Sequence, residues 1–462
     1  MPAPGTGQAG RVPSLPPSDP AGSTASARLW LGLGAALTLI AVAVLLPRWT
    51  GWEVYSHATP GARDVAPLHS RWDPKVGLGT VPALLVAVLA WRYAVVWAEK
   101  LTWRRLLAGS YVVGLVWMLA LAYVDGSAGV SRALGNSYEY LDTARATTDI
   151  PAMLREYVDR IPYTAPDNWV THIAGHPPGA LLFFVVLDRI GLGGDWPAGM
   201  VVTLLAATTP LAVLVTLRVL GAETVARRAA PFLVLGPAAV WTAVSADGLF
   251  ACVAAWGLAS LAVGATRDRT GSTVAWSALA GVLLGYCVLM SYGLPLLGLI
   301  AVAVLLAARS WRPLPVAAAT ASLVVLAFAA GGFALWEAFP VLRERYWDGV
   351  AAKRPVSYWL WANLAALCLS AGPILGAGLA QLLALRRRAE RAVVLLVGGA
   401  AAAIVVASLS LMSKGEVERI WLPFVPWLLI CTALLPVRWR RAGLALQLVV
   451  ALVVQHLLYT SW

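Results

Sequence analysis

The sequence predicts an all-α polytopic membrane protein with about 13 transmembrane helices. Of its 462 residues 60% are hydrophobic, and its mean hydropathy is +0.74. Many apolar runs reach the length of about 20 residues that a helix needs to cross a bilayer. Arginines recur in short clusters between these runs, as the preference of basic residues for the cytoplasmic side requires. Together these patterns favour a chain that crosses the membrane many times.

Charge and cysteine content exclude two other classes of protein. A net charge of +12 would suggest nucleic acid as a partner of a soluble chain, but here the basic residues follow the membrane topology, so no nucleic acid is expected. The four cysteines lie in four different apolar runs and form no CxxC pair. A disulfide framework and a zinc site are therefore not expected.

The chain divides into four regions. Residues 1–27 are rich in Pro, Gly, Ser and Ala, which predicts a disordered cytoplasmic tail. Residues 28–124 hold the N-terminal transmembrane helices, residues 125–176 form a polar external loop with juxtamembrane helices, and residues 177–462 form the transmembrane core. The arginine clusters place the N-terminus in the cytoplasm, and they place the external loop, with the loop at 47–77, outside a multi-pass cell-membrane protein.

The membrane spans of the core are expected from its apolar runs. They fall at about 229–245, 249–265, 274–290, 293–308, 314–335, 358–384, 391–411, 420–436 and 442–459. Before them, Pro177–Ile190 and Ala198–Leu217 are both apolar, but two crossings would place the arginines at 218–228 outside. We expect the shorter run, Pro177–Ile190, to be a half-buried or juxtamembrane helix; otherwise these arginines break the charge rule.

The external loop contains one strongly amphipathic segment. Asp149 followed by Pro151 is typical of a helix start. Apolar residues then recur with helical spacing at Ile150, Met153, Leu154, Tyr157, Val158 and Ile161. The pattern predicts a helix that lies in the membrane interface or packs on the protein's own spans.

Two carboxylates and a guanidinium precede this helix. If the segment is helical, Glu139, Asp142 and Arg145 share a face at a spacing of three. A carboxylate of this kind can act as a general base, and an arginine can bind a phosphate with two hydrogen bonds. The alternative is a surface helix whose Arg145 pairs with Asp142 or Asp149.

The two histidines of the loop, His172 and His176, are four residues apart. They could reach one metal ion or one phosphate if the turn between them is helical. Because Pro177 and Pro178 oppose a continuous helix there, His176 could equally cap a helix that the prolines open. The sequence thus predicts no specific cofactor, and a divalent metal ion remains one alternative.

Two further external segments carry charge. One holds Lys353 and Arg354 among aromatic residues, and the other holds Lys414 and Arg419 with two glutamates between them. Cations on the outer face oppose the charge rule, and a lipid phosphate would give them a role. The alternatives are an interfacial anchor and a set of mutual ion pairs.

The order of these motifs resembles that of the GT-C superfamily of polytopic glycosyltransferases, which includes protein O-mannosyltransferases and aminoarabinose transferases. The residues that carry the resemblance are Tyr138-Glu139-Tyr140, Thr143-Ala144-Arg145, His176-Pro177-Pro178-Gly179, Ser245-Ala246-Asp247-Gly248 and Arg419-Ile420-Trp421-Leu422-Pro423. The acidic motif departs from the family pattern, since it reads Tyr-Glu and not Asp-Glu and follows the third span and not the first.

The resemblance implies transfer of a sugar from a polyprenyl-phosphate donor to a glycan, lipid or protein acceptor of the cell envelope, with mannose or arabinofuranose as the expected sugar. It implies Glu139 as the base, with Asp142 as second choice, and Asp247 as a residue that orients the acceptor or a metal. It implies Arg145, His176, Lys414 and Arg419 as candidates for the donor phosphate. The residue pattern itself adds His172, Lys353 and Arg354 as substrate-binding candidates. The competing functions are a transporter or flippase of a lipid-linked sugar and a non-catalytic membrane scaffold.

Overall fold

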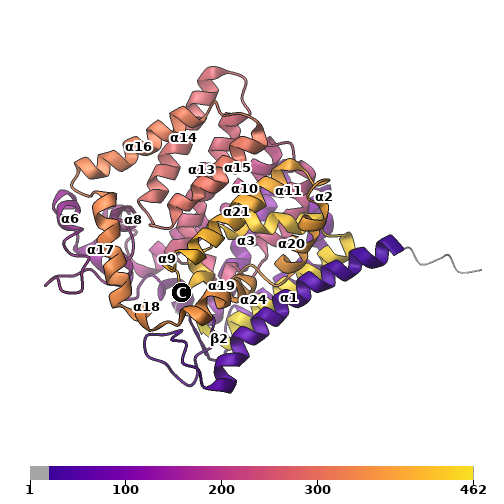
Figure 1. Ribbon diagram of the computed structural model, residues 1–462, viewed down its shortest axis with the longest axis horizontal. Helices are drawn as coiled ribbons and strands as arrows, with labels where there is room; N and C mark the ends of the chain where they lie inside the picture. The colour runs from indigo at the N-terminus through magenta and orange to yellow at the C-terminus, as the bar shows by residue number, and fades with distance from the viewer. Residues whose placement is uncertain (1–19, 461–462) are drawn as a thin grey trace, which may run out of the picture.

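The structure is a computed structural model that describes residues 20–460. It is a bundle of α-helices with one short two-stranded sheet (Figure 1). The N-terminal region contains α1 (Pro20–Thr50), β1 (Ser70–Trp72), α2 (Thr80–Lys100), α3 (Trp103–Ala122) and η1 (Tyr123–Asp125). The external loop and its boundary contain α4 (Ala128–Ser131), α5 (Leu141–Ala146), α6 (Ile150–Glu156), α7 (Thr171–Ala174) and α8 (Pro178–Arg189).

The remaining elements form the core and the C-terminal part of the bundle. The core contains α9 (Asp195–Ala206), α10 (Thr209–Val219), α11 (Glu223–Val234), α12 (Ala239–Thr242), α13 (Ala246–Ala265), α14 (Thr270–Val288), η2 (Leu294–Leu296), α15 (Leu297–Ala308) and α16 (Leu314–Ala330). The C-terminal part contains α17 (Leu335–Asp348), α18 (Val350–Lys353), α19 (Val356–Ser370), α20 (Ile374–Leu385), α21 (Arg391–Leu409), α22 (Val417–Ile420), α23 (Val425–Leu429), η3 (Ile430–Leu434), α24 (Val437–Leu457) and β2 (Leu458–Thr460).

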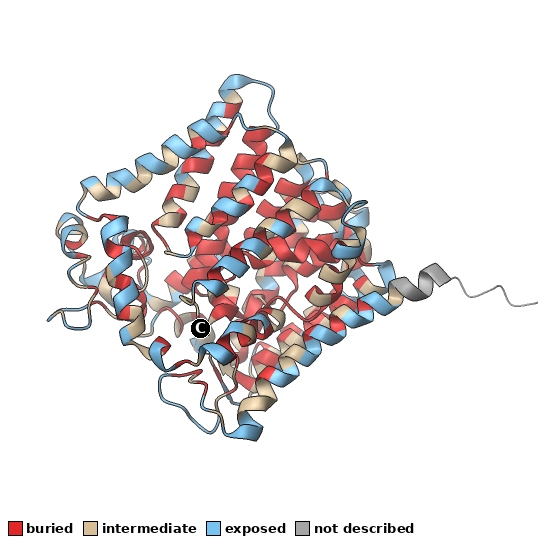
Figure 2. Ribbon diagram, viewed as in Figure 1, coloured by how far each residue is buried: buried red, intermediate tan, exposed pale blue. Residues whose placement is uncertain are grey.

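This is the architecture of an all-α membrane protein. Within the described residues, 7 helices are long and apolar enough to cross a membrane, or up to 9 if each of two bent helix pairs is one span. Buried residues fill the centre of the bundle and exposed ones follow its outline, including the outer side of α1 (Figure 2). Exposed leucines, valines and tryptophans on α1, α2 and α14 are what a lipid-facing surface requires. The expected count of thirteen spans stays a prediction.

Two of the expected spans are sharply bent. The run at 314–335 ends as α16, and α17 leaves it at 74°, while the run at 358–384 is broken between α19 and α20 at 101°. The second break lies at Gly372 and Pro373, where Gly372 has a φ of +86° and Pro373 precedes the first residue of α20. A positive φ and a residue without an N–H both interrupt a helix. The span predicted at 358–384 is therefore not one straight helix but two helices joined by a sharp bend.

Helix length distinguishes the two apolar runs between residues 177 and 217. Helix α8 has 12 residues, or about 18 Å at 1.5 Å per residue, well short of the about 30 Å of a bilayer core. Helices α9 and α10 together form one candidate span, Asp195–Val219. The expectation that only one of the two apolar runs is long enough to cross is thus confirmed.

Two predicted boundaries change. Residues 1–19 of the predicted tail lie outside the described residues, but residues 20–27 belong to α1, because extending a formed helix costs little. The amphipathic helix begins as predicted, with the Asp149 side chain accepting a hydrogen bond from the Ala152 N–H at 2.9 Å. It ends at Glu156, yet Tyr157 and Ile161 remain buried.

The small sheet was not predicted. Strands β1 and β2 pair antiparallel, with Ser70 opposite Thr460 and Trp72 opposite Leu458. This pairing holds the loop after α1 against the end of α24. It brings residues 51–73 to the end of the bundle where the external loop and the turn before α22 also lie.

Candidate functional site

The centre of the candidate site is a buried ion pair between Arg419 and Asp247. Arg419 Nη1 lies 2.6 Å from Asp247 Oδ2, and their side chains are only 7% and 6% exposed. Asp247 lies in the first turn of α13, where the Ser245 side chain caps the helix by accepting a hydrogen bond from the Gly248 N–H. Arg419 lies in α22, a single turn of helix. The pair joins two segments that are 172 residues apart.

Glu416 connects this pair to a second arginine. Its Oε2 lies 3.1 Å from Arg419 Nη2 and its Oε1 lies 2.9 Å from Arg354 Nη2. The turn that presents it has a positive φ at both Gly415 (+86°) and Glu416 (+61°). A Cβ at Gly415 would come within 3.0 Å of the Arg354 guanidinium. Only glycine therefore allows this turn to approach Arg354 so closely.

Glu139 and His172 form a second buried pair next to the first. Glu139 Oε1 lies 3.3 Å from His172 Nδ1, and each side chain is 7% exposed. The His172 N–H donates to the Tyr138 carbonyl at 3.1 Å, which holds α7 beside the residues before α5. The other carboxyl oxygen, Glu139 Oε2, is buried and has no hydrogen-bond partner among the described residues. It is thus a free acceptor inside the protein.

The protonation of these groups follows from their burial. The pKa of Glu139 is raised to about 8, chiefly by burial and also by Asp247 and Glu416, against the opposing charge of Arg419. Burial also holds the pKa of His172 well below its usual range, helped by Arg419. A carboxyl with a raised pKa beside a set of fixed charges is typical of a functional site.

Arg419 itself stays charged. Burial lowers its pKa, but the carboxylates of Asp247, Glu416 and Glu139 outweigh burial and raise the pKa above its usual value. For Glu416, burial acts to raise the pKa, but the cationic Arg354 and the nearby His69 and Arg419 hold it well below its usual range. The core of the site therefore keeps a permanent cation between two carboxylates.

His176 lies at the edge of the cluster, against aromatic rings. Its Nδ1–H donates to the His172 carbonyl at 2.7 Å, and its ring contacts those of Tyr140 and Phe250. The chain is not continuously helical here, because α7 ends at Ala174 and α8 begins at Pro178. The alternative that His176 caps α8 is wrong, since the N-cap residue is Pro177 and the helix has no side-chain cap.

The loop after α1 contributes residues that sequence reasoning did not assign to the site. The His69 N–H donates to Glu418 Oε1 at 2.7 Å, and His69 Nδ1–H donates to the Ser56 carbonyl at 2.8 Å. The His69 ring packs on His57 with centroids 3.9 Å apart. Burial raises the pKa of Glu418 to about 7. The only sequence signal for His57 and His69 is that the histidines lie in segments predicted to be external. That signal does not show which residues they contact.

Three predicted site residues lie outside the cluster. Arg145 pairs with Asp142 at 3.1 Å and with Asp195, and Asp142 is 63% exposed. Because α5 begins at Leu141, Glu139 precedes the helix and does not share its face with Asp142. The predicted common face of Glu139, Asp142 and Arg145 is therefore wrong. Lys353, the third of these residues, is exposed to solvent.

Arg354 and Lys414 are in the cluster, but their donors bind the protein itself. Arg354 donates from Nε to the Tyr55 carbonyl at 3.0 Å, from Nη1 to the Lys414 carbonyl and from Nη2 to Ser56 and Glu416. Lys414 Nζ donates to the Arg354 carbonyl at 2.9 Å and lies over the Trp347 ring. Both residues therefore stabilise the turns around the site. The prediction had instead assigned them to a bound phosphate.

A metal site has no support in the described part of the chain, where no group of three or more His, Cys, Asp or Glu side chains could hold an ion.

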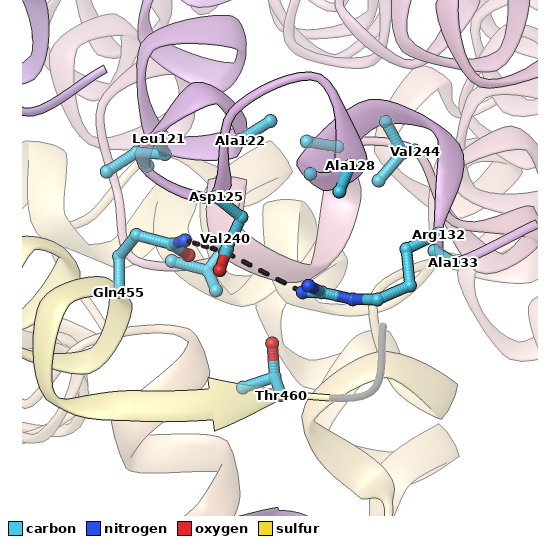
Figure 3. Close-up of a pocket in the computed structure, with 12 residues that line it drawn as sticks. Leu121, Ala122, Asp125, Ala128, Arg132, Ala133, Val240, Val244, Gln455 and Thr460 are labelled. Atoms are coloured by element: carbon cyan, nitrogen blue, oxygen red, sulfur yellow. Dashed lines mark hydrogen bonds and ion pairs between the residues drawn. The ribbon is translucent and has the colours of Figure 1, made fainter. Parts of the chain in front are cut away.

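The small polar pocket of Figure 3 is a separate feature: Asp125 accepts a hydrogen bond from Gln455 at 2.9 Å and lies 3.7 Å from Arg132. Lys75 Nζ lies 2.9 Å from the same carboxylate. These bonds tie the start of the external loop to α24 and to the loop after α1.

Comparison of the chain with protein family models, with curated proteins and with solved structures finds no match.

The contacts of Arg354 predict that it is a stability residue. Arg354→Lys cannot reproduce hydrogen bonds from three nitrogens and leaves Glu416 and three carbonyls short of donors, so we expect a loss of about 3–5 kcal/mol in stability. Thermal unfolding of the purified protein in detergent measures it. Lys353→Ala, at the exposed neighbouring residue, is the matched control and should change the melting temperature little. Equal melting temperatures for the two variants would contradict this interpretation.

Proposed function

We propose that the protein is a membrane glycosyltransferase that moves a sugar, mannose or arabinofuranose, from a polyprenyl-phosphate donor to a cell-envelope acceptor. The observation that carries the proposal is the free oxygen of Glu139, buried beside His172 and within electrostatic reach of the Arg419–Asp247 pair. A general base and a fixed cation side by side are what the transfer of a sugar from a phosphate to a hydroxyl needs.

The chemistry assigns a role to each member of the cluster. The acceptor hydroxyl attacks the anomeric carbon, the bond from that carbon to the phosphate oxygen breaks, and Glu139 takes the hydroxyl proton. Charge develops on the departing phosphate, and Arg419 is a buried arginine whose charge acts on Glu139. Since Asp247 and Glu416 already fix the Arg419 guanidinium, no reorganisation is needed when that charge appears. His172 keeps the Glu139 carboxyl in place.

The competing function, transport or flipping of a lipid-linked sugar, receives less support. A transport path needs ionisable residues deep within several spans. In the cluster, Glu139, His172, Glu416 and Arg419 lie on short helices and turns, and Asp247 lies in the first turn of α13. The charges are therefore gathered at the ends of helices, which suits a reaction centre at the membrane surface.

We also propose that this site faces the outside of the cell membrane and that the N-terminus is cytoplasmic. The arginine clusters support this orientation, because they fall in the connections on the other side of the spans in the expected topology. Ser137 and Arg388 are exposed and test it. Cysteine at Ser137 should react with a membrane-impermeant maleimide added to intact cells, and cysteine at Arg388 should react only after lysis. The unsubstituted protein is the control, and the reverse labelling pattern excludes this orientation.

The assignment of the base predicts different effects at the two acids of the same loop. Glu139→Gln keeps the shape of the side chain but cannot take a proton, so we expect transfer to fall at least about 100-fold. Asp142→Asn alters an exposed ion pair and should leave the rate within about twofold. The measurement is radiolabelled sugar transfer from a short-chain polyprenyl-phosphate donor in reconstituted vesicles. A fully active Glu139→Gln variant would remove the catalytic role from this loop.

The raised pKa of Glu139 predicts the pH dependence of transfer. The base must be ionised, and its pKa is raised to about 8 by burial, so kcat/KM should rise with pH through about 8 and be lost as the pH falls below it. Asp142→Asn should keep this ascending limb. A profile that is flat between pH 6 and 9 in the unsubstituted protein would show that Glu139 is not the group that controls the rate.

A further inference from the structure

Tyr140, the residue after Glu139, has a buried hydroxyl without a hydrogen-bond partner. The residue is 1% exposed, and no described residue bonds its hydroxyl oxygen. The ring packs against two others, stacked on Phe184 with centroids 5.1 Å apart and in a T-shaped contact with His176 at 6.0 Å. The hydroxyl group is thus fixed in position by packing and not by a bond of its own.

Two tyrosines of the described part of the chain, Tyr140 and Tyr292, have a buried hydroxyl without a partner, and Tyr140 is the one beside the candidate site. Other buried tyrosines differ. The hydroxyl of Tyr157, also fully buried, donates to the carbonyls of Ile173 and His176 at 2.9 and 3.0 Å. The hydroxyl of Tyr358 donates to the Ala43 carbonyl at 2.8 Å. A buried hydroxyl without a partner costs folding free energy, so it needs a physical explanation. For Tyr140, which is adjacent to Glu139 in the candidate site, the explanation indicated is a ligand that supplies the missing bond.

The surroundings of Tyr140 show which ligand the hydroxyl would meet. The charges of Glu139, Asp247 and Arg419 all act on it, so it lies among the groups of the candidate site. Burial, and then the carboxylates of Glu139 and Asp247, raise the pKa of Tyr140 well above its usual value. The phenol therefore stays protonated and can donate. Its neighbour Glu139 presents a free acceptor, Oε2.

We infer that Tyr140 is a further substrate-binding residue, whose hydroxyl donates a hydrogen bond to an oxygen of the phosphate-linked sugar while the adjacent Glu139 accepts the proton of the attacking hydroxyl. This inference rests on the proposed function and deepens it. A free donor and a free acceptor on neighbouring residues, both buried, match a ligand that carries oxygen atoms of both kinds. A substrate oxygen is then the hydrogen-bond acceptor that the Tyr140 hydroxyl lacks within the protein.

The inference is tested with Tyr140→Phe, which removes one oxygen and leaves the ring packing intact. Because the hydroxyl bonds nothing in the protein, its loss should leave the melting temperature unchanged or raise it. Binding of a short-chain polyprenyl phosphate carrying mannose or arabinofuranose, measured by titration in detergent, should weaken about 10- to 100-fold, because a substrate oxygen loses its buried donor. A parallel titration with the polyprenyl phosphate alone distinguishes a phosphate oxygen, for which binding also weakens, from a sugar oxygen, for which it does not.

Two tyrosines serve as controls. Tyr157→Phe removes bonds to two carbonyls and should lower the melting temperature. Tyr138→Phe changes a side chain that is 60% exposed and should alter neither stability nor binding. A lower melting temperature for Tyr140→Phe with unchanged binding would show that the hydroxyl has a structural role and would overturn the inference.

Arg419→Ala separates a failure of this inference from a failure of the proposed function. If Arg419→Ala loses donor binding and Tyr140→Phe binds both donors as tightly as the unsubstituted protein, the role of Tyr140 is excluded and the function stands. If the unsubstituted protein binds neither donor and transfers neither sugar, the proposed function is excluded, and the role of Tyr140 as a donor-binding residue is excluded with it.

Discussion

The pairing of Arg419 with Asp247 and Glu416 is the interaction on which the rest of the candidate site depends. A guanidinium that is 7% exposed is costly to bury without close carboxylates, and the two carboxylates are costly to bury without a cation. The three charges therefore require one another. Because they come from the first turn of α13 and from the turn that leads into α22, their pairing also sets the distance between these two segments. Glu139 and His172 are placed against an arrangement that is already fixed.

Arginine side chains stabilise the irregular segments of this structure by donating hydrogen bonds to their carbonyl groups. Segments that are neither helix nor sheet leave backbone carbonyls without partners, and burying them requires donors from elsewhere. Arg354 supplies donors to three carbonyls of the turns around the site. Arg345 does the same for the external loop, donating to the carbonyls of Ile161 and Trp169. These two arginines explain how an end of the bundle with so little regular structure can be well packed.

This use of arginine changes the interpretation of cations in the segments predicted to be external. A cation in that position could bind a lipid phosphate, and Arg354 and Lys414 were candidates for it. Their hydrogen bonds instead go to their own chain, to backbone carbonyls and, from Arg354, also to the Glu416 side chain. What remains for a ligand are the atoms whose bonds the protein leaves unmade, chiefly Glu139 Oε2 and the Tyr140 hydroxyl. A buried group without a partner is a better guide to a ligand than a cation whose donors bind its own backbone.

The sequence by itself determined the class of the protein, because the length and polarity of a transmembrane helix follow from local composition. It also singled out Glu139, His172, His176, Asp247 and Arg419, since buried or external polar residues are conspicuous in so apolar a chain. It could not decide that Glu139 is buried while Asp142, three residues later, is exposed, because that depends on α5 beginning at Leu141. Nor could it bring His69 to Glu418, which are 349 residues apart. Those contacts depend on how β1, α13 and α22 pack together, and such packing is a property of the whole bundle that no local pattern records.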